Sequence, residues 1–189
     1  PALIARGIPD EAFQAIDKGD DQDDKKACTS FKQRNRKLRA GQQTLSLHLL
    51  QHDLLELSTR ARKLSDMADD NPALLAAKER AYQDFADSEE MRRQWLLADA
   101  WCATFTVPKT LDTAEGSQTF DVFYQLRDQG TLPADEAALD RVREQSERYG
   151  FFHWHLAFPD VFTPIDEPSD DDPTGWTGGF DLVFGNPPW

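Results

Sequence analysis

Residues 47–64 read LHLLQHDLLELSTRARKL, and apolar side chains recur in this stretch at alternating spacings of three and four. The positions are Leu47, Leu50, Leu54, Leu57, Ala61 and Leu64. Helices that pack along one another show this spacing, so the stretch predicts a helix that needs a helical partner. Proline is absent from residues 25–71, and glycine occurs there only at Gly41. We therefore expect one long helix over residues 25–65, which Gly41 can interrupt.

A partner helix is predicted immediately downstream. Asn71-Pro72 supplies a helix N-cap and a proline that is favoured in the first helical turn. A second helix should begin there and run to about Thr104. Its apolar side chains can cover the leucine seam, which predicts an antiparallel helical hairpin. Residues 95–105 are apolar on most faces and are expected to enter a globular core. The large apolar side chains of this helix are Leu74, Leu75, Tyr82, Phe85, Trp95, Leu96 and Trp101.

Shorter elements are expected on either side of the hairpin. Residues 1–24 read as an irregular segment with one helical turn after Pro9. A short helix is predicted over residues 118–127, and a second one begins at residues 132–135. Glycines mark the ends of both helices, at Gly130 and Gly150.

The charge balance and the cysteine content exclude several classes of protein. The net charge of -13 argues against a free-standing nucleic-acid module, because DNA binding rewards Lys and Arg side chains that face phosphates. Cys28 and Cys102 lack CxxC spacing, so neither a disulfide framework nor a zinc knuckle is expected. No apolar stretch approaches the roughly 18 residues of a membrane span. The reducing cytoplasm is the expected location.

The C-terminal residues carry the strongest functional signal. Residues 180–184, FDLVF, form a short apolar run that is typical of a buried parallel strand, and Asn186-Pro187-Pro188-Trp189 comes shortly after it. Open α/β folds bind their ligands in loops at the carboxyl edge of the sheet. Consecutive prolines fix the backbone and remove donors, so this loop would present carbonyl oxygens beside the Asn186 side-chain oxygen.

Two fixed acceptors suit one chemical task. They can hold both hydrogens of an exocyclic amine and keep the nitrogen lone pair directed at an electrophilic methyl group. Trp189 can stack on the ring that bears the amine. Because the amine of a paired adenine lies inside the duplex, such a site requires a base that is flipped out of the helix.

Residues 181–189, DLVFGNPPW, resemble motif IV of the amino-group DNA methyltransferases, whose (Asn/Asp/Ser)-Pro-Pro-(Tyr/Phe/Trp) loop binds the flipped base. The Asn-Pro-Pro-aromatic form implies adenine N6 as the methylated atom. By this resemblance Asn186 and the Pro187 carbonyl would accept from the adenine amine. Pro188 would hold the turn, and Trp189 would stack on the base. Looser similarity to the large methyltransferases of type IIS/IIG restriction-modification and related phage-defence systems lies in GIPDEAF, RNRK and FFHWHLAFPDVF, at residues 7–13, 34–37 and 151–162.

Pattern and resemblance together predict a mainly α fragment, with a long antiparallel helical hairpin, shorter helices, and a terminal strand and loop that belong to a Rossmann-like methyltransferase sheet. The expected divisions are a connecting segment (1–24), a helical hairpin insertion (25–105) and a partial catalytic domain (106–189). The implied cofactor is S-adenosylmethionine, yet the chain has no Gly-x-Gly loop to bind it. We therefore expect the chain to be inactive alone. The parent protein would add the cofactor-binding and target-recognition parts, would bind DNA, and could associate with restriction or defence subunits.

Two other interpretations stay open. The same tetrapeptide serves glutamine-N5 protein methyltransferases and guanine-N2 RNA methyltransferases, although those enzymes are compact and a helical insertion of this size argues against them. The other class is a non-enzymatic helical module, whose hairpin binds a partner protein or DNA while the terminal loop is idle. A Phe-x-Gly-x-Gly-like loop upstream in the encoding reading frame would favour the methyltransferase.

One dense positive stretch stands out in this acidic chain. In a helix it could be a solvated face, or it could contact DNA phosphates. Its members are Lys32, Arg34, Arg36, Lys37 and Arg39.

Two pairs of histidines could be taken for metal ligands. His48 and His52 lie one helical turn apart, but no further ligand completes a set, so a solvated helix face is expected. His153 and His155 would share one face of an extended segment over residues 151–158. For this pair we expect packing or hydrogen bonding.

A loose nuclease-like pattern also occurs. Pro9-Asp10 with Asp24-Lys25-Lys26 imitates the Pro-Asp…(Asp/Glu)-x-Lys arrangement that holds a divalent ion in some nucleases. Both pieces lie in an acidic region without strands to position them, so we expect no such site.

Overall fold

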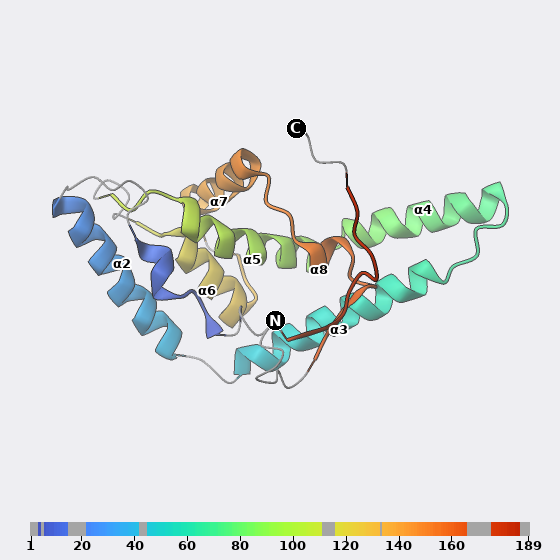
Figure 1. The fold of residues 1–189 in the computed structure, drawn as a ribbon, viewed down its shortest axis with the longest axis horizontal. Helices are drawn as coiled ribbons and strands as arrows, with labels where there is room; N and C mark the ends of the chain where they lie inside the picture. The colour runs from blue at the N-terminus through green and yellow to red at the C-terminus, as the bar shows by residue number, and fades with distance from the viewer. Residues whose placement is uncertain are drawn as a thin grey trace.

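Helices make up most of the computed structural model, which describes residues 4, 6–14, 22–41, 45–110, 116–132, 134–165 and 175–185. Figure 1 shows an elongated molecule with α2 at one end, an arm of α3 and α4 at the other, and α5, α6 and α7 between them. The predicted mainly helical class is confirmed. Within the described ranges no helix is both long and apolar enough to cross a membrane. The elements in chain order are η1, a 3₁₀ helix (Asp10–Phe13), α2 (Gln22–Gly41), α3 (Leu45–Ser65), α4 (Pro72–Ala86), α5 (Glu89–Thr106), α6 (Thr119–Gln129), α7 (Glu136–Tyr149), α8 (Trp154–Ala157), β1 (Phe162–Pro164) and β2 (Trp176–Gly178).

The predicted helical hairpin is present between α3 and the successive helices α4 and α5. Near the turn, Lys78 Nζ in α4 donates to the Ser65 carbonyl oxygen of α3 at 3.0 Å. Further from the turn, Arg93 in α5 pairs with Asp53 in α3 at 2.8 Å. Residue numbers rise along α4 and α5 as they fall along the neighbouring α3, so the two sides of the hairpin are antiparallel. Asn71 caps α4 as predicted, because its side chain accepts from two backbone N–H groups.

Both predicted long helices are divided. The first ends at Gly41 and resumes as α3, and α2 packs against η1 rather than within the hairpin. The second was predicted to be continuous, and that is wrong, because it breaks at Asp87-Ser88. Ser88 is the N-cap of α5, and its side chain accepts from the Met91 backbone N–H at 3.3 Å. Serine before two glutamates is a helix-start signal, which the apolar periodicity obscured.

The leucine seam faces the core wherever its side chains are described. Leu54, Leu57 and Ala61 are buried in the main hydrophobic cluster. The side chains of residues 45–51 lie outside the described part of the chain. α3 also contacts α6 and β1. The seam therefore packs into a core that includes other elements besides the helices of the hairpin.

The body of the protein is built around α5, which packs against α6 and α7. This packing confirms that residues 95–105 enter a globular core. Both short helices end as predicted, in glycines with left-handed backbone, Gly130 at φ 65° and Gly150 at φ 60°. η1 also confirms the helical turn after Pro9. The division of the chain at residues 24 and 105 stays a prediction, since α5 belongs to the hairpin and to this core at once.

Candidate functional site

A two-stranded hairpin carries the chain toward the Asn-Pro-Pro-Trp motif. β1 and β2 pair antiparallel, with Thr163 opposite Thr177. Gly178, at the end of β2, has φ +89°, and a Cβ added there would lie 2.3 Å from the Val161 carbonyl oxygen. Only glycine permits both this backbone and this approach. Gly178 therefore determines where the chain leaves the hairpin.

We expect Gly178→Ala to weaken the pairing of β1 with β2 by at least about 1–3 kcal/mol, the cost of a left-handed backbone for a residue with a Cβ. Overlap with the Val161 oxygen should add to that cost. Hydrogen exchange of the Ile165 amide, which donates to the Gly175 carbonyl at 3.0 Å, measures the loss of pairing. Gly185→Ala is the matched control, because a Cβ there meets nothing within 4 Å. Equal exchange in the two variants would contradict the requirement for glycine at residue 178.

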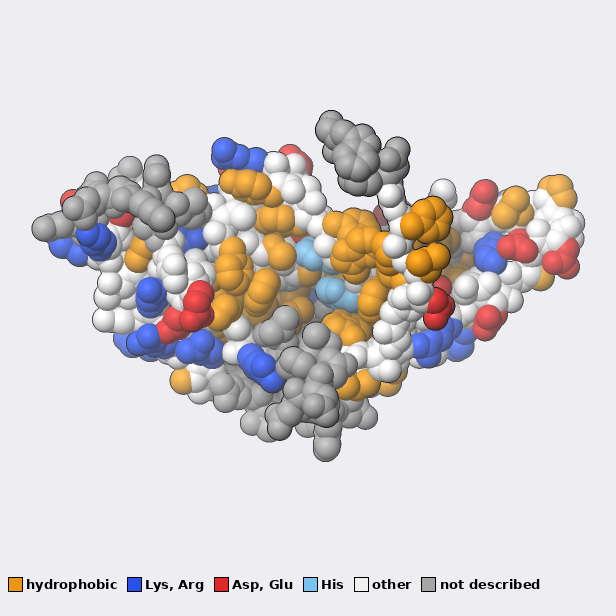
Figure 2. All heavy atoms as spheres, in the orientation of Figure 1, with side chains coloured by type: hydrophobic (Ala, Val, Ile, Leu, Met, Phe, Trp, Pro, Cys, Tyr) orange, Lys and Arg blue, Asp and Glu red, His pale blue; other side chains and the backbone are white. Residues whose placement is uncertain are grey.

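After the hairpin, Phe180 anchors the chain in an aromatic cluster. Its ring packs edge-on against Trp154, Phe158 and Phe162, at centroid distances of 5.8, 5.1 and 5.6 Å. Phe152 joins the cluster 5.0 Å from Trp154. Figure 2 shows hydrophobic side chains gathered around the middle of this face, on both sides of the C-terminal segment. The chain segment that leads to the motif therefore begins at this aromatic cluster.

Beyond Phe180 the chain leaves the body of the protein. Leu182, Val183 and Phe184 are 75%, 71% and 88% exposed, and residues 181–185 form no strand. The described chain therefore does not form the predicted buried parallel strand over residues 180–184, and the Rossmann-like sheet is not confirmed. Such a strand needs neighbouring strands and covering helices, whereas the described strands β1 and β2 pair only with each other. The predicted site residues Asn186, Pro187, Pro188 and Trp189 lie outside the described residues.

Two histidines lie against the aromatic residues of this region. His153 is buried, with Nε2 2.7 Å from Asp99 Oδ1 of α5. The His155 ring packs on Trp176 at 4.8 Å, and burial lowers the pKa of His155 to about 3. Packing and hydrogen bonding are thus confirmed, but residues 151–158 do not form one extended segment, since a short helix interrupts it. Four of them, Trp154–Ala157, form α8, in which the His153 carbonyl accepts from the Leu156 and Ala157 backbone N–H groups. Among the described residues, no group of three or more His, Cys, Asp or Glu could hold a metal ion.

The lowered pKa of His155 makes the stability of the protein depend on pH. The unfolded chain binds a proton at this residue near pH 6.5, whereas the folded chain binds it only near pH 3. Between these values the unfolded state holds more protons, so the free energy of unfolding should decrease as the pH falls. His155→Phe keeps a ring against Trp176 and should remove this part of the pH dependence. Urea unfolding of both proteins at about pH 7 and about pH 4 measures it. Identical losses in the two proteins would show that His155 is not the group responsible.

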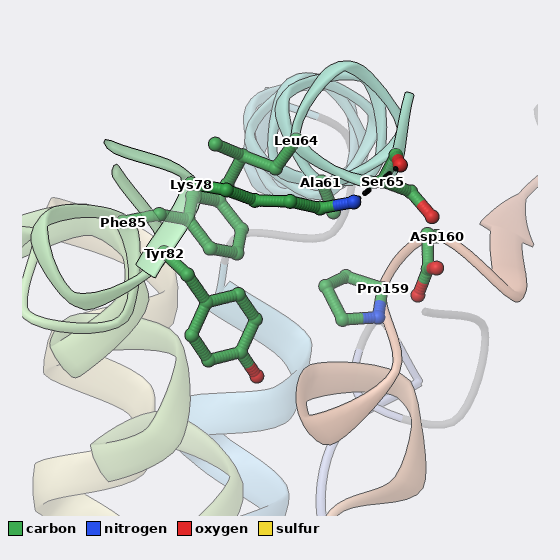
Figure 3. A pocket seen from close by; sticks show the side chains of 8 residues that line it. All are labelled: Ala61, Leu64, Ser65, Lys78, Tyr82, Phe85, Pro159 and Asp160. Carbon is green, nitrogen blue, oxygen red and sulfur yellow. Dashed lines mark hydrogen bonds between the residues drawn. The ribbon is translucent and has the colours of Figure 1, made fainter. Parts of the chain in front are cut away.

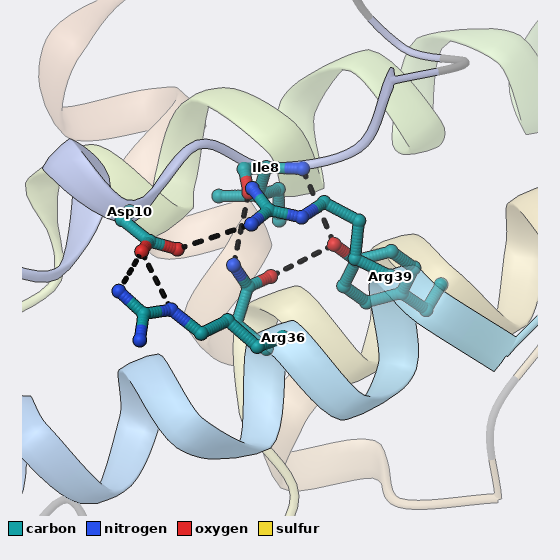
Figure 4. Close-up of polar contacts among 6 residues, drawn as sticks. Ile8, Asp10, Arg36 and Arg39 are labelled. Atoms are coloured by element: carbon teal, nitrogen blue, oxygen red, sulfur yellow. Dashed lines mark hydrogen bonds and ion pairs between the residues drawn. The ribbon is translucent and has the colours of Figure 1, made fainter.

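Asp10, from the nuclease-like pattern, is held by arginines of α2. Arg36 Nε donates to its carboxylate at 2.7 Å, and Arg39 lies 3.5 Å from the other oxygen (Figure 4). The hydrogen bond from Arg36, above all, lowers the pKa of the Asp10 carboxyl group. Asp24 lies more than three turns before Arg36 in the same helix, about 18 Å along the axis. The two carboxylates therefore do not come together around an ion, and Asp10 has a structural role.

The rest of the basic stretch also lies on α2. Arg34 pairs with Asp121 at 2.9 Å. Lys32 is half-buried and Lys37 is exposed. The arginines would have to exchange a carboxylate for a phosphate in order to bind DNA, which makes Lys37 the member best placed to do so. DNA contact by this stretch stays a prediction. In the other histidine pair, His52 is exposed as expected, and the His48 side chain is outside the described part.

Two buried polar side chains escaped the sequence analysis. Asn35 donates to the Ile8 carbonyl at 2.9 Å and accepts from the Tyr124 hydroxyl at 2.8 Å, which ties α2 to α6. Lys109 Nζ donates to the Thr104 carbonyl at 2.6 Å, and burial lowers the pKa of Lys109 to about 8. A lysine just after a helix can bind the last carbonyls of that helix, and this signal was available. No local sequence pattern indicated that Asn35 would be buried.

Comparison of the chain with known protein families, with curated proteins and with solved structures found no significant match. The resemblance to methyltransferases therefore rests on residues 181–189 and on the chemistry that those residue types allow.

Proposed function

We propose that this chain is part of an S-adenosylmethionine-dependent methyltransferase that methylates adenine N6 in duplex DNA, within a cytoplasmic restriction-modification or phage-defence system. The observation that carries the proposal is the sequence of residues 181–189, in which Asn-Pro-Pro-Trp directly follows a short apolar run. Asn186 and the Pro187 carbonyl accept from the adenine amine, Pro188 holds the turn, and Trp189 stacks on the flipped base.

The exposure of the apolar run supports this proposal. Burying a Leu, Val or Phe side chain is worth roughly 1.5–3 kcal/mol, and Leu182, Val183 and Phe184 gain little of it from the described residues. β-branched and aromatic side chains favour strands. A run of this kind fits a strand that is completed by the sheet of a larger protein. In that sheet the motif would follow at the carboxyl edge, where α/β folds bind ligands.

The described residues do not fit the cofactor. β1 and β2 are antiparallel, and no unit of strand, glycine-rich loop and helix occurs among the described segments. In this proposal other parts of the parent protein bind S-adenosylmethionine, and the present chain contributes the base-binding loop. No step of the reaction is therefore assigned to residues 1–185.

The test is methyl transfer by the product of the complete reading frame that encodes this chain. That protein is incubated with isotope-labelled S-adenosylmethionine and mixed-sequence duplex DNA, and the DNA is digested to nucleosides. Labelled N6-methyladenine is the expected product, and the 189-residue chain alone should leave the DNA unlabelled. Parallel incubations with RNA and with a protein substrate test the related enzymes, which would label RNA guanine or protein glutamine instead. Absence of any methyl transfer would favour a non-enzymatic module.

A further inference from the structure

Two pockets in the described part of the chain have similar volumes but differ in the polar groups that line them. Figure 3 shows the pocket between α3 and α4, of about 220 Å³, in which Lys78 is the basic residue. Lys78 donates to the Ser65 and Met67 carbonyls and to Asp69, each at 3.0 Å. Since an ammonium group has three donors, Lys78 has none left for a ligand.

The second pocket, of about 250 Å³, lies where the end of α6 meets α5 and α3. Its apolar lining is supplied by Leu97 of α5 and Leu126 of α6, which are 2% and 4% exposed. Gln94 precedes Leu97 by three residues, a spacing that places both side chains on the same face of α5. Gln94 also lines the pocket, so its side chain points the same way as that of Leu97.

The Gln94 carboxamide is buried without a hydrogen-bond partner. Gln94 is 4% exposed, and within the described part of the chain its side chain neither donates nor accepts a hydrogen bond. Its oxygen and nitrogen are not among the described atoms that are sealed inside the protein, so they meet the space of the pocket. A carboxamide offers one acceptor and two donors, and a buried one is nearly always bonded. The partner of Gln94 must therefore come from whatever occupies the pocket.

Two ion pairs beside Gln94 balance the charge of the lining. Arg93 of α5 pairs with Asp53 of α3 at 2.8 Å, and Arg127 pairs with Asp128 in α6 at 2.6 Å. Each of these charged side chains already has an opposite charge beside it. A charged ligand would have to displace one of these partners, whereas an uncharged ligand would leave both pairs intact.

We propose that this pocket binds a small uncharged molecule that presents a hydrogen-bond donor and an acceptor side by side. The Gln94 carboxamide pairs with that edge through two hydrogen bonds, as glutamine does with an adenine base. Leu97 and Leu126 contact the rest of the molecule. A nucleobase and a primary carboxamide share this chemistry.

The volume of the pocket limits the size of this ligand. About 250 Å³ is less than the roughly 300–1,000 Å³ of sites for larger ligands, so a molecule of one ring fits better than a nucleotide cofactor. The proposal is independent of methyltransferase activity.

An NMR titration of the isotope-labelled 189-residue chain tests binding at Gln94 itself. The probes are uracil and benzamide, which carry the same donor and acceptor edge on a nucleobase and on a carboxamide. At least one probe should shift the side-chain amide signals of Gln94 and reach saturation, and the one that binds tighter identifies the kind of ligand. The fully N-methylated forms of both probes have no N–H donor and should bind at least about tenfold more weakly.

Substitution then separates the role of the carboxamide from that of the apolar lining. Gln94→Met keeps an unbranched side chain of similar length, and the removed amide has no described protein partner, so the fold should survive. Probe binding, followed at the backbone amide of Gly130 in the lining, should weaken at least about tenfold. Gln83→Met is the matched control, because Gln83 is exposed on α4, and it should leave binding unchanged. The comparison with the N-methylated probes needs no substitution and decides even if Gln94→Met does not fold.

Three results would overturn the proposal. If neither uracil nor benzamide shifts the Gln94 signals at millimolar concentration, water alone satisfies the carboxamide. Equal binding of the probes and their N-methylated forms would show that the apolar lining holds them. Tighter binding of benzoate than of benzamide would show that the arginines of the pocket select a carboxylate instead of an uncharged molecule.

Discussion

Asn186→Ala should lower the rate of adenine methylation by the complete protein about 100-fold or more, because a positioned group that stabilises the reacting centre commonly contributes that much. The substitution removes the side-chain oxygen that accepts from the adenine amine in the proposed mechanism, and with it the orientation of the nitrogen lone pair. Thermal stability should be unchanged. The removed group acts on the substrate amine rather than on the hydrophobic core.

The rate is best measured in a single turnover with saturating S-adenosylmethionine, so that product release does not mask the chemical step. Gln83→Ala is a matched control, because it also removes a carboxamide but from an exposed position on α4. Gln83→Ala should methylate at the wild-type rate. Methylation by Asn186→Ala at nearly the wild-type rate would mean that the loop has a structural role and does not hold the adenine amine.

Leu54→Asp should be the most destabilising of the substitutions considered, at roughly 2–5 kcal/mol. Leu54 is 3% exposed and belongs to the main hydrophobic cluster. The change removes packing in the seam of α3 and places a carboxylate where no water reaches it. For a chain of this size each kcal/mol corresponds to about 2–4 °C, so the thermal midpoint should fall by roughly 4–20 °C.

His52→Ala is the control for the register of α3. His52 lies two residues before Leu54, and its side chain is 76% exposed. A surface substitution of this kind usually changes stability by less than about 0.5 kcal/mol. Both thermal midpoints can be measured by circular dichroism, which follows the loss of helix as the protein unfolds. A loss at His52 as large as the one at Leu54 would show that α3 faces the core with its other side.

Sequence analysis identified one part of the candidate functional features and missed another. A chemical role for Asn-Pro-Pro-Trp could be proposed from the sequence because its four residues are consecutive, and prolines restrict their own backbone. The exposure of α4 was not foreseen. Leu74, Leu75 and Tyr82 were assigned to the hairpin contact, whereas the structure leaves all three exposed. Periodicity identifies an apolar stripe but does not say whether the same chain covers it.

The sequence by itself determined the features that depend on a few neighbouring residues. Asn71 caps α4, and Gly130 and Gly150 end α6 and α7, because caps act within one helical turn. The buried side of α3 was also predictable, since the spacing of its leucines places them on one face.

Only the tertiary structure decided features that join distant residues. Asp10 meets Arg36 across 26 positions of the chain, which turns a metal-like pattern into an ion pair. α2 packs on η1 instead of extending the hairpin, because contacts with η1 and α6 hold it there. Residues 180–184 carry a strand pattern yet stand exposed, since a strand gains its stability from neighbouring strands, and the only described ones are engaged with each other.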